Sequence, residues 1–143
     1  MKTKTINIMG RNVSLAYCAA TETGYETISG KSIQTFVPTF GKDENGNDII
    51  KEPAPATMQD YILLAIAAIV TYYARKGEEA PVNSDDIIYE CKPAEVTLLV
   101  ATVLELRNEW YNIPKVVVDQ IKAEAGDEKA DESPKNAQPP TND

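Results

Sequence analysis

A run of ten apolar residues, 61–70, constrains the fold of this chain more than any other feature. On a helix, this run is apolar on every side, whereas a surface helix usually shows an apolar stripe of about 100°. Thr57 and Asp60 have the spacing of a capping box, with Asp in place of the usual Glu or Gln. A long helix that begins there and ends at Lys76, before Gly77, is therefore expected to need cover on more than one side.

A second long helix is expected over residues 93–112, because Pro93 suits a first helical turn and Ile113-Pro114 ends a helix. Its apolar residues form two adjacent stripes at helical spacing. The first stripe consists of Val96, Leu99, Val103, Leu106 and Trp110, and the second of Val100, Leu104 and Tyr111. The core of the domain can cover one stripe, so the other needs a separate cover.

Two explanations of this apolar surplus stay open. An N-terminal hairpin, the first helix and a short helix over residues 85–91 can together cover it. Otherwise it forms an interface, either with copies of this chain or with an apolar helix of another protein. Paired aromatic residues on both helices are of the kind that anchors an interface. The candidate interaction residues are therefore Tyr72, Tyr73, Val100, Leu104, Trp110 and Tyr111.

The N-terminal segment predicts a β-hairpin. Residues 3–9 alternate between polar and apolar side chains, as a half-buried strand does. Val13 and Leu15 continue the alternation on a return strand, and Gly10-Arg11 suits the two-residue turn between the strands.

Four or five helices are expected after this hairpin, and the two long helices are among them. Residues 16–29 predict a helix that Gly30 ends, and Gly24 weakens this helix by about 1 kcal/mol relative to alanine. Ser84 is expected to cap a short helix. Residues 115–125 can form a final helical piece.

Two segments lack the pattern of a regular element. Residues 41–56 combine turn-forming residues, charges and prolines without periodicity, which predicts a long exposed loop, either a mobile binding arm or a flap hinged at Asn45-Gly46. Residues 126–143 contain no Val, Ile, Leu, Met or aromatic residue, which predicts a disordered acidic tail. The expected fold is thus a single α+β domain, residues 1–125, that is mainly helical and is followed by this tail.

Composition argues against several functions. With 14 basic and 22 acidic residues the net charge is −8, so the chain should repel a nucleic-acid backbone. The sequence has no histidine, the commonest general base and metal ligand. Cys18 and Cys91 lie far apart, and no phosphate-binding, nucleophile-elbow or zinc-protease motif occurs. The turn at residues 43–48 also lacks the glycine and glutamate positions of a calcium loop. We therefore expect no enzyme activity, no metal and no cofactor.

Location follows from the apolar segments. The N-terminus has no apolar stretch of the secretory type, and the ten-residue run is about half of the roughly 20 residues that cross a bilayer. A cytoplasmic protein without a membrane span is expected.

Two short sequence motifs resemble those of a known protein family. Residues 6–11 read Ile-Asn-Ile-Met-Gly-Arg in the expected hairpin, and residues 26–33 read Glu-Thr-Ile-Ser-Gly-Lys-Ser-Ile where the first helix ends. With the long apolar helix and the helical remainder, this order resembles the tail assembly chaperones of long-tailed bacteriophages. In that family the first helix commonly closes with a similar motif, from which Thr27 departs. The resemblance covers about residues 4–112, and the segment 41–56 is longer than the family leads one to expect.

The resemblance implies a non-enzymatic protein of the infected cell's cytoplasm that forms homo-oligomers. Such chaperones keep the tape measure protein soluble, a long, apolar, largely helical chain, and pass it to the polymerising tail tube protein. One alternative is a structural virion or head-to-tail joining protein, which would be present in purified particles. A further alternative is an enzyme with a carboxylate–metal site, whose melting temperature would rise with divalent metal.

Overall fold

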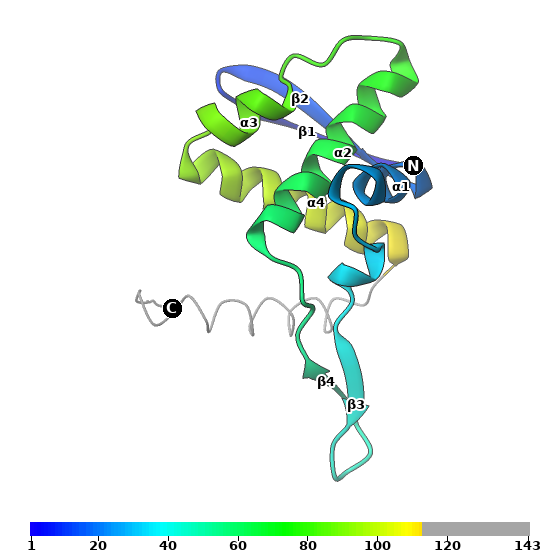
Figure 1. The fold of residues 1–143 in the computed structure, drawn as a ribbon. Helices are drawn as coiled ribbons and strands as arrows, with labels where there is room; N and C mark the ends of the chain where they lie inside the picture. The colour runs from blue at the N-terminus through cyan, green and yellow to red at the C-terminus, as the bar shows by residue number, and fades with distance from the viewer. Residues whose placement is uncertain (113–143) are drawn as a thin grey trace. The chain divides into compact units, whose positions relative to one another are not determined.

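The computed structural model describes residues 1–112 (Figure 1). Its elements are β1 (Lys2–Ile8), β2 (Arg11–Tyr17), α1 (Ala19–Ser29), the 3-10 turn η1 (Ile33–Phe36), β3 (Thr39–Lys42), β4 (Asp48–Glu52), α2 (Met58–Lys76), α3 (Ser84–Glu90) and α4 (Pro93–Tyr111). This order confirms the expected α+β fold, mainly helical and opened by a hairpin. The predicted helix over residues 115–125 and the predicted tail over residues 126–143 lie outside the described residues.

Strands β1 and β2 form the expected antiparallel hairpin, with Ile6 opposite Val13. The turn residues are Met9 and Gly10, with φ of 53° and 73°, and not Gly10-Arg11 as predicted. A two-residue hairpin turn of this kind needs positive φ at both positions, and Arg11 instead pairs with Ile8 in the ladder. The turn therefore lies one residue earlier than the sequence suggested.

Helix α1 begins at Ala19 rather than at residue 16. Ala16 and Tyr17 continue β2, where they pair with Thr3 and Lys2, so the ladder takes these residues from the helix. The predicted end is correct, because Gly30 adopts φ of 72° and its N–H bonds to the carbonyl of Glu26.

Both predicted ends of α2 are confirmed. The Thr57 side chain accepts from the backbone N–H of Asp60, the Asp60 carboxylate accepts from the N–H of Thr57, and Gly77 closes the helix with φ of 70°. The cap of α3 differs from the prediction. Asn83, not Ser84, accepts from the N–H of Asp86, since α3 begins one residue earlier than expected.

The core forms around α2, which packs against α1, β2 and α4, while α4 also contacts both strands of the first hairpin (Figure 1). Buried side chains come from every one of these elements. The largest are Ile8, Leu15, Tyr17, Tyr25, Leu64, Ile69, Leu99 and Leu106. Because α2 has neighbours on several sides, most of its apolar surface is covered.

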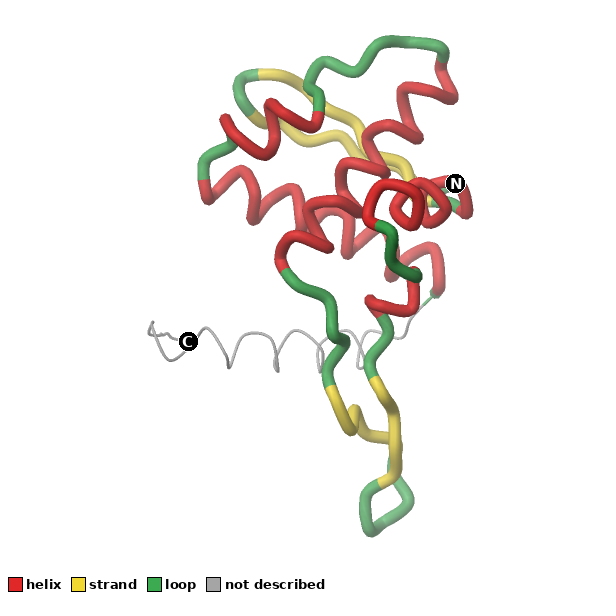
Figure 2. The backbone as a smooth tube through the Cα atoms, viewed as in Figure 1, coloured by secondary structure: helices red, strands yellow, loops and turns green. Residues whose placement is uncertain are grey.

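The prediction of an irregular loop over residues 41–56 is wrong in part, because β3 and β4 form an antiparallel hairpin (Figure 2). Phe40 pairs with Ile50, and the Asp43 carboxylate accepts from the backbone N–H groups of Asn45 and Asn47 at 2.8 and 2.9 Å. These bonds hold the pKa of Asp43 below its usual range. Asn45-Gly46 thus lies in the turn at the tip of a hairpin and is not a hinge.

The described chain divides into two compact units. Met1–Val37 and Pro55–Asn112 form the first, which we call the body, and Pro38–Ala54, with its β3–β4 hairpin, belongs to the second. The site below lies within the body alone.

Candidate functional site

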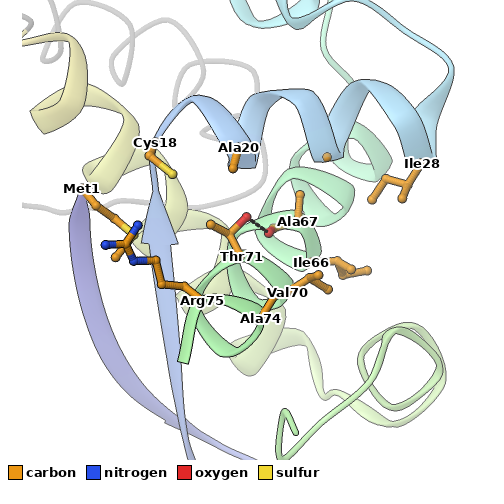
Figure 3. A pocket seen from close by; sticks show the side chains of 11 residues that line it. Met1, Cys18, Ala20, Ile28, Ile66, Ala67, Val70, Thr71, Ala74 and Arg75 are labelled. Atoms are coloured by element: carbon orange, nitrogen blue, oxygen red, sulfur yellow. Dashed lines mark hydrogen bonds between the residues drawn. The ribbon is translucent and has the colours of Figure 1, made fainter. Parts of the chain in front are cut away.

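An open apolar groove lies between α1 and α2, with a volume of about 450 Å³. We call it the α1–α2 groove, and Figure 3 shows its lining. The eleven lining residues are Met1, Cys18, Ala20, Gly24, Ile28, Ile66, Ala67, Val70, Thr71, Ala74 and Arg75.

Helical spacing produces the walls of this groove. On α1, Ala20, Gly24 and Ile28 follow one another at intervals of four residues, and such residues lie on one face of a helix. On α2, Ile66 and Val70 continue the same interval toward Ala74. Each row covers two helical turns, or about 12 Å at 1.5 Å per residue.

Small residues give the groove its depth. A Cβ atom placed on Gly24 would lie 3.6 Å from the Cβ of Ala67, so the two helices approach closely at that point. The alanine side chains on both helices cannot fill the space above this crossing. The larger Ile28 and Val70 border it and are 50% and 57% exposed. The result is an apolar surface that the body itself does not cover.

Few of the lining residues are polar, and the charged one lies at one end of the groove. The Thr71 hydroxyl donates to the carbonyl of Ala67 at 2.8 Å, within its own helix. Arg75 is the one charged residue among the eleven, and Figure 3 shows its side chain beside Met1, at the opposite end from Ile28. No ion pair found within residues 1–112 involves Arg75.

The groove contains none of the six residues that the sequence proposed for interaction. Tyr72 and Tyr73 contact each other, with ring centroids 4.9 Å apart. The Tyr73 hydroxyl accepts from the backbone N–H of Ser14 at 3.1 Å, and Lys76 lies over the Tyr72 ring at 5.3 Å. Both tyrosines are half-buried and contribute to the packing of α2.

The four candidates on α4 differ in exposure. Val100 is 9% exposed and Leu104 is half-buried, so the second stripe of α4 is largely covered. Trp110 and Tyr111 are exposed at the end of the helix. The α1–α2 groove thus lies away from the predicted stripe.

Tyr111 also ties the end of α4 to α1. Its hydroxyl and that of Tyr17 both donate to the Glu22 carboxylate, the latter at 2.8 Å. The Arg107 guanidinium lies 5.0 Å from the centre of the Tyr111 ring, within reach of a cation–π contact. Desolvation and the bond to Glu22 raise the pKa of Tyr111 to about 12.

The most buried carboxylate belongs to Asp60, which is 2% exposed. It accepts from the Thr57 N–H at 2.8 Å, the Tyr25 hydroxyl at 3.0 Å and the Lys31 ammonium at 3.1 Å. Desolvation opposes ionisation, but these bonds outweigh it and lower the pKa of Asp60. With its oxygens engaged, Asp60 joins the end of α1 to the start of α2.

Within residues 1–112 no group of three or more Cys, Asp or Glu side chains could hold a metal ion. No helix in that part of the chain is long and apolar enough to cross a membrane. Comparisons with protein-family models, curated proteins and solved structures find no match. The function must therefore be inferred from the chain's own geometry.

The α1–α2 groove was not predicted, because the apolar stripes in the sequence consist of large residues and the groove is lined mainly by small ones. The available signal was the row of small residues on α1, in which Ala20 and Gly24 stand four positions apart. Their spacing allows a close helix crossing, but only the pairing of α1 with α2 shows where that crossing lies.

Proposed function

We propose that this protein is a non-enzymatic tail assembly chaperone of a long-tailed bacteriophage. In this proposal it shields the tape measure protein before the tail tube polymerises. The observation that carries it is the α1–α2 groove, an open apolar surface two helical turns long. A surface of this kind suits an apolar helical partner, and apolar surface left open on a folded domain usually marks an interaction site.

The position of residues 26–33, the sequence motif on which the family resemblance depends, supports the proposal. Residues 26–33 close α1, because Glu26 accepts from the N–H of Ile33 at 2.8 Å and Gly30 takes the left-handed conformation. Ile28 of the same motif lines the groove. The motif therefore shapes both the end of α1 and one wall of the candidate site.

The remaining parts of the proposal come from the resemblance. They are action in the cytoplasm of the infected bacterium, assembly into homo-oligomers and transfer of the tape measure protein to the tail tube protein. Val70 and Ile28 offer exposed apolar surface for any of these contacts.

Co-expression tests the proposal. The partner candidate is the product of a very long, helix-rich reading frame next to the gene. We expect this product to be soluble and to co-purify with the chain, and to aggregate when expressed alone. An insoluble product in both cases would contradict the proposal.

Purified phage particles provide a second measurement. A chaperone should be absent from mature particles when their proteins are identified by mass spectrometry. Stoichiometric presence of the chain would instead support the alternative of a structural virion or head-to-tail joining protein.

A further inference from the structure

We propose that the α1–α2 groove binds an amphipathic helix with large aliphatic side chains three and four residues apart and one carboxylate that pairs with Arg75. This inference depends on the proposed function, since it specifies the partner chemistry of that same site.

The shape favours a helix with large side chains. The two walls run for about 12 Å, the length over which a helix makes two turns and presents side chains at three- and four-residue spacing. The groove between them is lined by Ala20, Gly24 and Ala67, whose small side chains leave room for the side chains of a partner. Leucine, isoleucine or methionine side chains would fill this space, whereas a partner of small residues would leave it empty.

The position of the charged residue sets the orientation in which a partner helix would lie in the groove. Arg75 lies at one end, and none of the ion pairs found in the described residues uses its guanidinium. The chain as a whole carries a net charge of −8, which disfavours a strongly acidic partner. A mainly apolar helix with a single carboxylate near Arg75 would pair with the guanidinium and would add little negative charge.

The chain does not itself present such a helix within residues 1–112. Its exposed large aliphatic side chains on helices are Ile28, Met58, Val70, Ile88 and Leu98, and no two of these stand three or four residues apart on one helix. A second copy therefore offers no described helix of the required pattern. We therefore assign the occupant to another protein, and binding by a second copy of this chain is an outcome of the test below.

A labelled synthetic peptide tests the inference on the full chain. The probe is a helical peptide of about five turns with leucines three and four residues apart and one glutamate at one end, and matched probes carry glutamine or lysine there. Fluorescence anisotropy measures binding. Circular dichroism and thermal melting establish that each protein variant is folded.

Val70→Asp should weaken binding about tenfold or more, because an unpaired carboxylate would be buried under the peptide. The matched control is Ile88→Asp, an equally exposed apolar residue on α3, outside the groove, and it should change affinity by less than about twofold. Equal weakening by both substitutions would overturn the inference.

Arg75→Glu tests the charge pairing. We expect roughly two- to fivefold weaker binding of the glutamate peptide and a gain of similar size for the lysine peptide, the range of an exposed ion pair. Affinities that ignore the sign of the peptide charge would overturn the pairing. A change of oligomeric state in Val70→Asp, without a change in peptide binding, would show a self-association surface and overturn the inference as well.

The two proposals fail in different ways. If peptide binding follows this pattern but the co-expressed tape measure candidate stays insoluble, the chaperone function is wrong and the groove is still a helix-binding site. If the Val70→Asp chain keeps that candidate soluble as well as the wild type does, the chaperone function stands and the assignment of the groove is wrong.

Discussion

The two long helices of this protein have the same length and a similar apolar character, but different surroundings. Helices α2 and α4 each have 19 residues, and both are apolar on more than one side. In each, a carboxylate three residues into the helix accepts from the backbone N–H of the cap residue, Asp60 from Thr57 and Glu95 from Lys92. Yet Val100 of α4 is 9% exposed and Val70 of α2 is 57% exposed.

The difference comes from the neighbouring elements. Helix α4 packs against α2 and against both strands of the first hairpin, whereas the side of α2 that carries Val70 borders the groove beside α1. Helix α1 presents Ala20 and Gly24 to the groove, which are too small to cover Val70. An apolar excess on a helix therefore does not identify an interface by itself, because the size of the residues opposite decides whether it is covered.

The sharpest test of this comparison uses the same substitution on both helices, and the larger effect is expected on α4. Val100→Asp should lower the free energy of unfolding by about 3 kcal/mol or more, because it places a charge in a buried position. Urea denaturation followed by circular dichroism measures the change. A loss below 1 kcal/mol would mean that the second stripe of α4 is open in solution.

The starts of the two helices provide the next test. Asp60→Ala should lower the free energy of unfolding by about 2–3 kcal/mol, since it removes the cap and leaves the buried Tyr25 hydroxyl without its acceptor. Glu95→Ala, at the more exposed start of α4, should cost about 1 kcal/mol. Similar losses in the two variants would contradict the distinction between a buried and a surface cap.

Because the pKa of Asp60 is lowered in the folded state, the stability difference between the wild type and Asp60→Ala should depend on pH. A carboxyl group whose folded-state pKa lies below its ordinary value of about 4 stabilises the fold above that pH and loses this contribution as the pH falls through the folded-state value. The stability gap between the wild type and Asp60→Ala should therefore shrink in acid. Urea denaturation between neutral pH and about pH 3 measures it.

A smaller effect is expected at the end of α4. Tyr111→Phe should lower the free energy of unfolding by about 1 kcal/mol at neutral pH, since the bond to Glu22 involves a charged acceptor but is exposed to solvent. The folded-state pKa of Tyr111, about 12, exceeds the ordinary value of about 10, so its stabilisation is lost as the pH rises between them. The alkaline decline should be shallower in the variant, and an unchanged decline would exclude Tyr111 as its source.

The smallest effect is expected at the open groove. Val70→Asp should change the free energy of unfolding by no more than about 0.5 kcal/mol, because Val70 already faces solvent. Thermal and urea unfolding measure it beside Val100→Asp. A large loss at Val70 would remove the contrast between the two helices.

Much of the fold could be predicted from local signals. The limits of α2 followed from the Thr57–Asp60 spacing and from Gly77, and the end of α1 followed from Gly30. Errors arose where tertiary pairing competed with propensity, as when β2 kept Ala16 and Tyr17 in its ladder. The β3–β4 hairpin was missed because its short strands have no clear alternation.

The candidate site was less predictable than the fold. The sequence indicated Tyr73 as one of a pair of aromatic residues and Val100 as part of an apolar stripe, and the structure buries both in whole or in part. The four-residue spacing of Ala20 and Gly24 allows a close helix crossing, but it does not say which helix crosses there. Their role appears only when another helix lies across them.

By itself, the sequence determined that this chain builds two long helices with more apolar surface than one face can use, because periodicity and caps are local properties of neighbouring residues. Only the tertiary structure decided which part of that surface stays open. The reason is physical: burial depends on the volume and approach of side chains from distant segments, and α1 supplies small residues where α2 presents Val70.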